Sequence, residues 1–192
     1  MTVRDIGVAI GLPEPYSGDL QTWRERLGDP AAARIPPHVT LLTPTLLPAG
    51  DLSAVEEHLS AVARTERPFQ IQLRGSGTFR PVSPVVFVTL VQGISSCERL
   101  QQRVRSGPLE RPLRFPYHPH VTVAHDVSEG QLDRAFDALA DYEARFEVGG
   151  FGLFERGRDG VWRPQRYFPF GRGLPASRQP DSRVGDRRVR GG

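Results

Sequence analysis

The string Pro-His-Val-Thr occurs twice in this chain, at residues 37–40 and again at residues 119–122. An aliphatic residue follows each copy, and the two histidines are 82 positions apart. Chance would give only about 0.2 His-x-Thr matches in a chain of this composition, so two copies in matching contexts indicate an internal duplication. The repeat therefore predicts two similar lobes, each of which contributes one His and one Thr to a shared cleft.

The composition is that of an ordinary globular protein. The 192 residues, of which 38% are hydrophobic and 24% charged, are enough for one domain or for two small lobes around a good core. No apolar stretch is long enough to span a bilayer, and the first residues lack a signal-peptide pattern. We therefore expect a cytoplasmic protein without membrane attachment. The single Cys97 excludes an internal disulfide, and without a recognisable His or Asp partner it is better interpreted as a core residue than as a nucleophile.

All 25 basic residues are arginines, and the net charge is +3. Residues 171–192 hold six of these arginines against two aspartates, so the rest of the chain is close to neutral. A near-neutral body is not the broad basic surface that coats long nucleic acids, and it fits a small, local anion site better. The segment 171–192 has no apolar periodicity and is predicted to be a disordered, Arg-rich tail after a domain that covers residues 1–170.

Hydrophobic periodicity predicts the same order of elements in both halves of the chain: strand, helix, His-x-Thr strand, helix, strand. In the first half Pro44 closes the His-x-Thr strand. The expected strands are 3–12, 38–42, 69–73, 85–91, 120–124, 146–154 and 161–168, and the expected helices are 19–27, 51–65, 95–105 and 129–141.

In a strand, residues two positions apart point to the same face. His38 and Thr40 therefore project together, as do His120 and Thr122, while the valines between them point into a core. Two imidazoles that face one bound group can act as a general base and a general acid, and the two hydroxyls can donate to the non-bridging oxygens of a phosphate. This chemistry needs no metal and no cofactor.

These two motifs resemble the signature of the two-histidine (2H) phosphoesterase superfamily, and in particular its bacterial 2′-5′ RNA ligase-like proteins and cyclic phosphodiesterases. The resemblance covers residues 1 to about 170. It implies an α+β, bilobal fold with antiparallel sheets lining a central cleft and helices on the outside. It also implies metal-independent action on 2′,3′-cyclic phosphates or 2′-5′ phosphodiester linkages, with His120 as the base, His38 as the acid, and roles that exchange with reaction direction.

Three residues near the motifs are further candidates for substrate contact. Phe79 follows a Gly-rich turn, and the resemblance suggests that this loop borders the cleft, where the ring could stack on a base or, alternatively, lie against the sheet. Arg114 and Tyr117 precede the second motif and could line its rim or serve the structure alone. His118 also precedes the second motif and could line the rim, but it lies outside the expected strand and is predicted to face away from His120.

Other functions are possible. The cluster of His118, His120, His125 and Asp126 allows a metal site, although no recognised ligand spacing supports one. The same fold could also be an RNA- or nucleotide-binding module without turnover, or the two motifs could be purely structural. The chain has no phosphate-binding P-loop and no lysine to adenylate, which excludes ATP-dependent ligation by those routes. We expect a monomer that acts on RNA ends or small cyclic nucleotides.

Overall fold

The computed structural model describes residues 2–113 and 115–171. Residues 172–192, which form nearly all of the predicted tail, and Arg114 lie outside this part. The elements, in chain order, are β1 (Val3–Gly11), α1 (Tyr16–Arg26), β2 (His38–Pro48), a 3-10 turn (Ala49–Asp51), α2 (Leu52–Thr65), β3 (Phe69–Thr78), β4 (Val85–Gln92), α3 (Ile94–Val104), a 3-10 turn (Gly107–Leu109), β5 (His120–His125), α4 (Glu129–Ala138), β6 (Glu143–Val148), β7 (Gly150–Arg156) and β8 (Trp162–Pro169).

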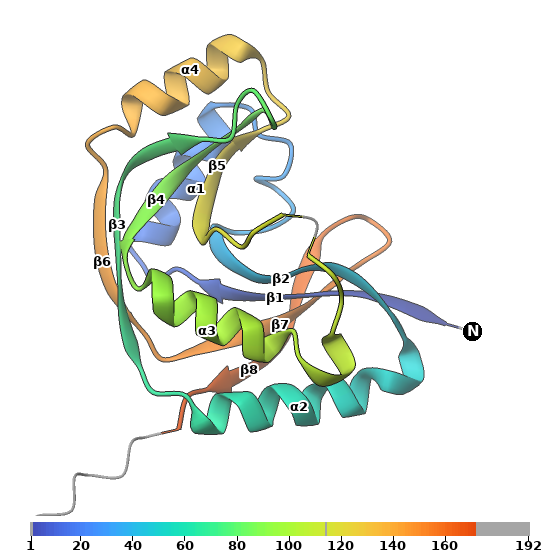
Figure 1. Ribbon diagram of the computed structural model, residues 1–192. Helices are drawn as coiled ribbons and strands as arrows, with labels where there is room; N and C mark the ends of the chain where they lie inside the picture. Colours follow the sequence, from blue (N-terminus) through green and yellow to red (C-terminus); the bar gives the residue numbers. More distant parts are fainter. Residues whose placement is uncertain (1, 114, 172–192) are drawn as a thin grey trace, which may run out of the picture.

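The strands form one antiparallel sheet in the order β6-β3-β4-β5-β2-β1-β7-β8. The sheet is curled, so that β3 and β6 run steeply in Figure 1 while β1 and β7 run across the view. Helices lie around it, with α4 at one end and α2 at the other. The predicted α+β fold, with antiparallel strands lining a cleft and helices outside, is confirmed.

The duplication is visible in both the chain order and the sheet. The units β1-α1-β2 and β4-α3-β5 have the same order, and their last strands, β2 and β5, meet at the centre of the sheet. The two half-sheets are not the two halves of the sequence, however. Strand β3 from the first half of the chain joins β4 and β5, whereas β7 and β8 from the end of the chain join β1 and β2.

The helices cross between the half-sheets. Helix α1 packs against β5, and α3 packs against β2, so each helix covers the central strand of the other unit. The core between helices and sheet contains Leu20, Leu100, Val39 and Val121, each less than 1% exposed. Burial of this continuous apolar layer stabilises the two units as one body.

The predicted end of the first His-x-Thr strand at Pro44 is wrong, because β2 continues to Pro48. Val8 pairs with Leu42 and Ile6 pairs with Thr45, so a single residue of β1 faces two residues of β2. Pro44 lies at this bulge, where its missing N–H removes no regular ladder bond. A sequence pattern cannot show that a bulge accommodates the proline.

The predicted strand 146–154 is also wrong, since it is two strands on opposite sides of the sheet. Strand β6 pairs with β3, and β7 pairs with β1. Gly149 separates them and Gly150 begins β7, where a Cβ on Gly150 would lie 2.5 Å from the Phe168 carbonyl oxygen. The backbone approach at this point explains why the break needs glycine.

Helices α1 and α4 differ most from the predicted bounds. Helix α1 begins at Tyr16 instead of residue 19 and ends at Arg26. Helix α4 ends at Ala138, three residues before the predicted end, and the Ser128 side chain accepts a hydrogen bond from the Gln131 N–H at its start. Among the helices of residues 2–113 and 115–171, none combines the length and the apolar composition needed to cross a membrane.

Gly77 on β3 leaves room for an aromatic ring of the neighbouring strand. A Cβ at this position would lie 2.5 Å from Phe87 Cε2 and 3.1 Å from Thr89 Oγ1, well inside van der Waals contact with the ring. Gly77 pairs with Phe87, so the ring lies across the β3 backbone. The ring can occupy this place only while residue 77 has no side chain.

We expect Gly77→Ala to lower the free energy of unfolding by about 1–3 kcal/mol, because the methyl group must displace the Phe87 ring or the strand. Gly130→Ala is the matched control, since a Cβ at Gly130 in α4 meets no atom within 4 Å. There the substitution should be neutral or stabilising. Urea unfolding of both variants measures the difference, and equal stabilities would contradict the packing described for Phe87.

Candidate active site

The two His-x-Thr strands meet side by side at the centre of the sheet. Val39 of β2 pairs with Val121 of β5 in antiparallel register, so an approximate twofold axis passes between them. Both valines are 0% exposed and face the helices, and the flanking residues therefore project to the opposite, open face. His38, Thr40, His120 and Thr122 are all partly exposed on this face. The structure thus brings together the four residues predicted from the repeat.

Each histidine is oriented by the backbone two residues before it. His38 Nδ1 donates to the Pro36 carbonyl oxygen at 2.8 Å, and His120 Nδ1 donates to the His118 carbonyl oxygen at 2.7 Å. A carbonyl oxygen only accepts, so the proton of each neutral imidazole lies on Nδ1. Each Nε2 is consequently left with a free lone pair and can take a proton from a bound group or, once protonated, return one.

Burial lowers the pKa values of both histidines. For His38 the pKa falls to about 4, because desolvation and the nearby charges of Arg24 and His120 outweigh the opposing hydrogen bond to Pro36. For His120 desolvation also lowers the pKa, assisted by His118 and opposed by the bond to the His118 carbonyl. Both imidazoles are therefore neutral near pH 7 while the cleft is empty.

The strands next to β2 and β5 make the two sides of the site different. Ala9 and Gly11 of β1 pair with Thr40 and His38, so that side has only small groups. On the other side, Phe87 and Thr89 of β4 pair with Thr122 and His120. The open face thus has a third hydroxyl group beside His120 and a recess beside His38.

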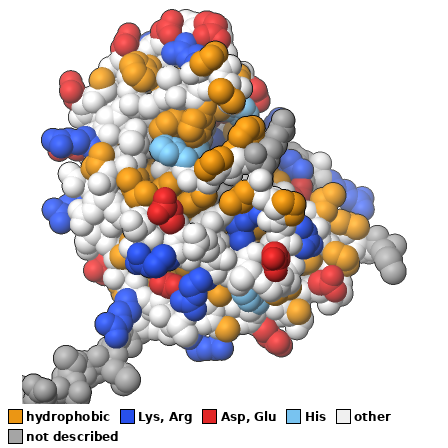
Figure 2. Space-filling model, in the orientation of Figure 1, with side chains coloured by type: hydrophobic (Ala, Val, Ile, Leu, Met, Phe, Trp, Pro, Cys, Tyr) orange, Lys and Arg blue, Asp and Glu red, His pale blue; other side chains and the backbone are white. Residues whose placement is uncertain are grey.

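Aromatic rings surround His120. The ring centroids of Phe79 and Phe87 each lie 5.0 Å from that of His120, and the two phenyl centroids are 4.4 Å apart. The predicted position of Phe79 beside the cleft is thus the one observed, whereas contact with substrate stays a prediction. In Figure 2 a surface histidine is bordered by hydrophobic side chains, with basic and acidic groups interspersed elsewhere on that face.

The prediction that His118 faces away from His120 is wrong. Their ring centroids are 6.0 Å apart with an interplanar angle of 27°, and the His118 ring also contacts both phenyl rings. Residues two apart in extended backbone point to the same side, and the rings of His118 and His120 have this relation although His118 precedes β5. His118 therefore lies exposed beside the site, as one of the residues expected near the rim, although its expected direction was wrong.

Tyr117 lies beneath the site. Its hydroxyl donates to the Thr40 carbonyl oxygen at 2.9 Å, which ties the segment before the second motif to the first motif. Burial raises the pKa of this phenol, so it stays protonated and can donate. The observed role of Tyr117 is to link the two strands, and its predicted contact with substrate remains a prediction. Arg114, the third candidate, lies outside the described residues.

A buried ion pair that the sequence analysis did not predict supports the loop that leads to His38. Arg24 Nε donates to Asp29 Oδ2 at 3.0 Å, and Arg24 Nη1 donates to the Ile35 carbonyl oxygen at 2.6 Å; Arg24 and Asp29 are only 3% and 5% exposed. The pair therefore fixes the loop that ends at the Pro36 carbonyl. The sequence held a signal, because Arg24 shares a helix face with Leu20 and Leu27 at i, i+4 and i+7 spacing.

The metal alternative has no cluster to support it within the described part of the chain. Residues 2–113 and 115–171 contain no group of three or more His, Cys, Asp or Glu side chains arranged to hold a metal ion. His125 Nε2 instead lies 3.5 Å from Asp126 Oδ1 at the end of β5. The titratable groups that do converge are the two motif histidines and His118.

The curled antiparallel sheet, with two His-x-Thr strands that meet at its centre, is what the resemblance to the two-histidine phosphoesterases implied. The profile of the 2′-5′ RNA ligase superfamily matches residues 12–160. This chain belongs to that superfamily.

The chain is also similar in sequence to curated relatives and in fold to solved structures. A protein of Bacillus licheniformis, named as a candidate phosphoesterase, is 28% identical to this chain; the match covers 78% of this chain and 89% of that protein. A protein of Halalkalibacterium halodurans with the same description is 27% identical, and the match covers 86% of this chain and 97% of that protein. Escherichia coli LigT without ligand has a TM-score of 0.65 at 23% identity, with 90% of this chain and all of LigT covered. The crystal structure of LigT complexed with 3′-AMP gives the same score and identity over 88% of this chain and 99% of LigT.

The low pKa of His38 predicts an acid-sensitive fold. As the pH falls below 6.5, the unfolded chain takes up a proton at this residue before the folded protein does. The contribution of His38 to the free energy of unfolding is therefore fully present above pH 6.5 and is lost as the pH falls towards about 4. His38→Gln removes this difference. Urea unfolding at pH 7 and pH 5 should show a larger loss for the wild type than for His38→Gln, and equal losses would contradict the pKa assignment.

The Arg24–Asp29 pair predicts a strong double-mutant coupling. Arg24→Met leaves a buried carboxylate without its partner and should cost about 3–5 kcal/mol of unfolding free energy. Asp29→Asn leaves the guanidinium unpaired while keeping an oxygen for the Ala31 N–H, which donates to Asp29 Oδ1 at 2.8 Å. Urea unfolding should show that the double variant loses clearly less than the sum of the single losses; additive losses would mean that the pair is not a coupled unit.

Proposed function

We propose that this protein is a metal-independent phosphodiesterase that opens 2′,3′-cyclic phosphates or cleaves 2′-5′ phosphodiester linkages of RNA or nucleotides. The observation that carries the proposal is the convergence of two imidazoles and two hydroxyls on one face of β2 and β5, with each Nδ1 bonded to a backbone carbonyl so that each Nε2 carries the lone pair. Ligand binding alone does not require two such groups, whereas acid–base catalysis does.

The reaction is a displacement at phosphorus. His120 Nε2 takes a proton from the attacking water, whose oxygen forms a bond to phosphorus while the bond to one ribose oxygen breaks. His38, protonated on Nε2, gives its proton to that leaving oxygen, and a phosphomonoester results. Thr40 and Thr122 donate hydrogen bonds to the non-bridging oxygens, on which negative charge accumulates. In the reverse direction the two histidines exchange roles.

The lowered pKa values fit this scheme if the bound substrate anion raises the pKa of one imidazole, which then takes up its proton from solvent. Both imidazoles are neutral in the empty cleft, but a phosphodiester anion between them favours the charged form of a neighbouring imidazole. One of the two then becomes the acid and the other remains a base. The pair titrates as a coupled unit, and the rate should show a bell-shaped dependence on pH.

The test is product analysis on an oligonucleotide that ends in a 2′,3′-cyclic phosphate, in excess EDTA. The wild type should give a single phosphomonoester, and His38→Ala or His120→Ala should each lower the rate by about 10²–10⁴-fold. His125→Ala on the same strand is the matched control and should retain activity, because its side chain lies beside Asp126 at the end of β5.

The outcome also decides between catalysis and binding. Turnover that needs an added metal, or that survives loss of either motif histidine, would contradict the proposed mechanism. No turnover by the wild type on cyclic and 2′-5′ substrates alike would favour the nucleotide-binding module of the same fold. The identity of the phosphomonoester, 2′ or 3′, shows which bond is broken.

A further inference from the structure

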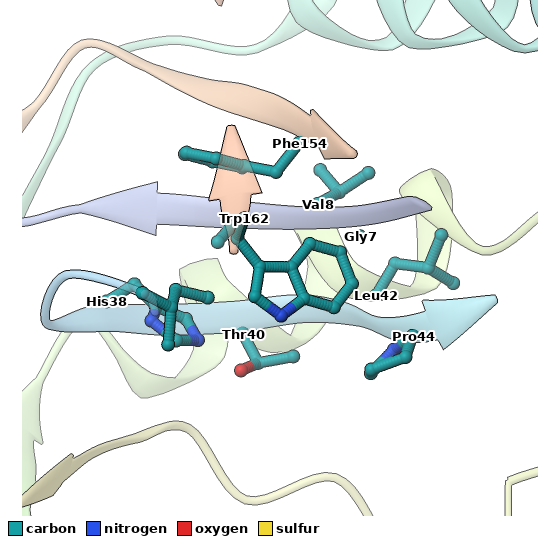
Figure 3. Close-up of a pocket in the computed structure, with 10 residues that line it drawn as sticks. Gly7, Val8, His38, Thr40, Leu42, Pro44, Phe154 and Trp162 are labelled. Atoms are coloured by element: carbon teal, nitrogen blue, oxygen red, sulfur yellow. The ribbon is translucent and has the colours of Figure 1, made fainter. Parts of the chain in front are cut away.

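An apolar pocket opens directly beside His38 and Thr40, on the side where β1 presents only small residues. The walls of this pocket come from β1, β2, β7, β8 and the loop before β2, and Figure 3 shows them around the two motif side chains. The apolar residues that line it are Val8, Ile35, Leu42, Pro44, Phe154 and Trp162. The proposed reaction uses none of them.

Trp162 is held in this pocket from several directions. Its backbone N–H donates to the Arg34 carbonyl oxygen at 2.8 Å, and its ring lies against β1, where a Cβ on Gly7 would be 3.1 Å from Trp162 Cζ3. The guanidinium of Arg156, which is paired with Asp5, lies 5.6 Å from the indole centroid. The indole is thus a fixed, partly exposed aromatic surface and not a mobile side chain.

The indole N–H has no hydrogen-bond partner within residues 2–113 and 115–171. Figure 3 shows the nitrogen edge of the Trp162 ring on the side of Thr40. An apolar aromatic surface whose polar edge faces the phosphate-binding residue suits a planar group with its own polar edge, attached to the bound phosphate.

The other side of the reaction centre has an aromatic surface of a different kind. There the rings of Phe79, Phe87 and His118 cluster around His120. The two histidines thus lie between two separate aromatic surfaces, one on each side of the approximate twofold axis. A phosphodiester has two ester arms, and each arm can place a nucleobase on one of these surfaces.

We propose that the pocket beside His38 is a nucleobase subsite in which Trp162 stacks on the base. The preferred substrate class is then a phosphodiester that carries a nucleoside on both sides, as a 2′-5′-linked dinucleotide does. A cyclic mononucleotide fills only one side. This inference rests on the proposed function for its reaction centre, but the base contact can be measured without turnover.

Fluorescence of Trp162 gives the direct test. The chain contains two tryptophans, so Trp23→Phe leaves Trp162 as the reporter, and His120→Ala in addition prevents cleavage during titration. The probes are 2′-5′-linked diadenosine monophosphate, the two analogues in which one or the other base is missing, and inorganic phosphate. Trp162→Phe, which keeps Trp23, is the matched control.

We expect the diadenosine compound and only one of the two single-base analogues to quench Trp162, while inorganic phosphate and the control variant show no change. Quenching by both single-base analogues to the same extent would overturn the two-sided cleft. No quenching by the diadenosine compound, when it competes with bound phosphate, would overturn the base subsite itself.

Kinetics separates this inference from the proposed reaction. Loss of base stacking in Trp162→Ala should lower kcat/KM for the diadenosine compound about 10- to 100-fold, with little effect on the analogue that lacks the stacked base. Trp162→Phe should retain most of the activity, and it serves as the control for a folding defect in the Ala variant. If the wild type turns over the substrate and Trp162→Ala does so equally fast, the base subsite alone is contradicted. If the substrate quenches Trp162 fluorescence but no turnover occurs, the proposed reaction alone is contradicted.

Discussion

The pairing of Val39 with Val121 is the constraint on which the site depends. It joins the two half-sheets at their inner strands, and both valines are completely buried beneath the crossed helices α1 and α3. Because the pairing is antiparallel, it places one His and one Thr from each strand on the same open face. A shift of one residue in this register would turn the His and Thr of the shifted strand into the core and leave those of its partner on the open face. The Tyr117 hydroxyl, bonded to the Thr40 carbonyl, holds the same two segments together.

The duplicated centre lies in surroundings that are not duplicated. Two orienting hydrogen bonds of the same kind direct the two imidazoles, yet one side of the site holds phenyl rings and the other holds small β1 residues with Trp162 behind them. A symmetric pair of titratable groups suits a reaction that runs in either direction. Asymmetric walls suit a substrate whose two ends differ, and they can fix which imidazole meets the leaving oxygen.

Burial and catalysis make opposite demands on these histidines. Desolvation keeps them neutral, and the Arg24 charge that supports the loop before His38 adds to this effect. The same low-dielectric surroundings strengthen the attraction between an imidazolium and a phosphate once a substrate is bound. The empty site thus avoids two buried positive charges, and the proposed acid arises only when an anion is present to compensate it.

The sequence by itself determined the four motif residues and the repeated order of elements. Alternation with a period of two places His and Thr on one face of a strand, and this local rule needs no knowledge of neighbours. Only the tertiary structure decided that β3 and the pair β7 and β8 exchange half-sheets, that Pro44 lies at a bulge, that His118 stacks near His120, and that Trp162 lies beside His38. These features depend on which distant strands pair and in what register, and that choice is set by burial of the whole core rather than by any local pattern.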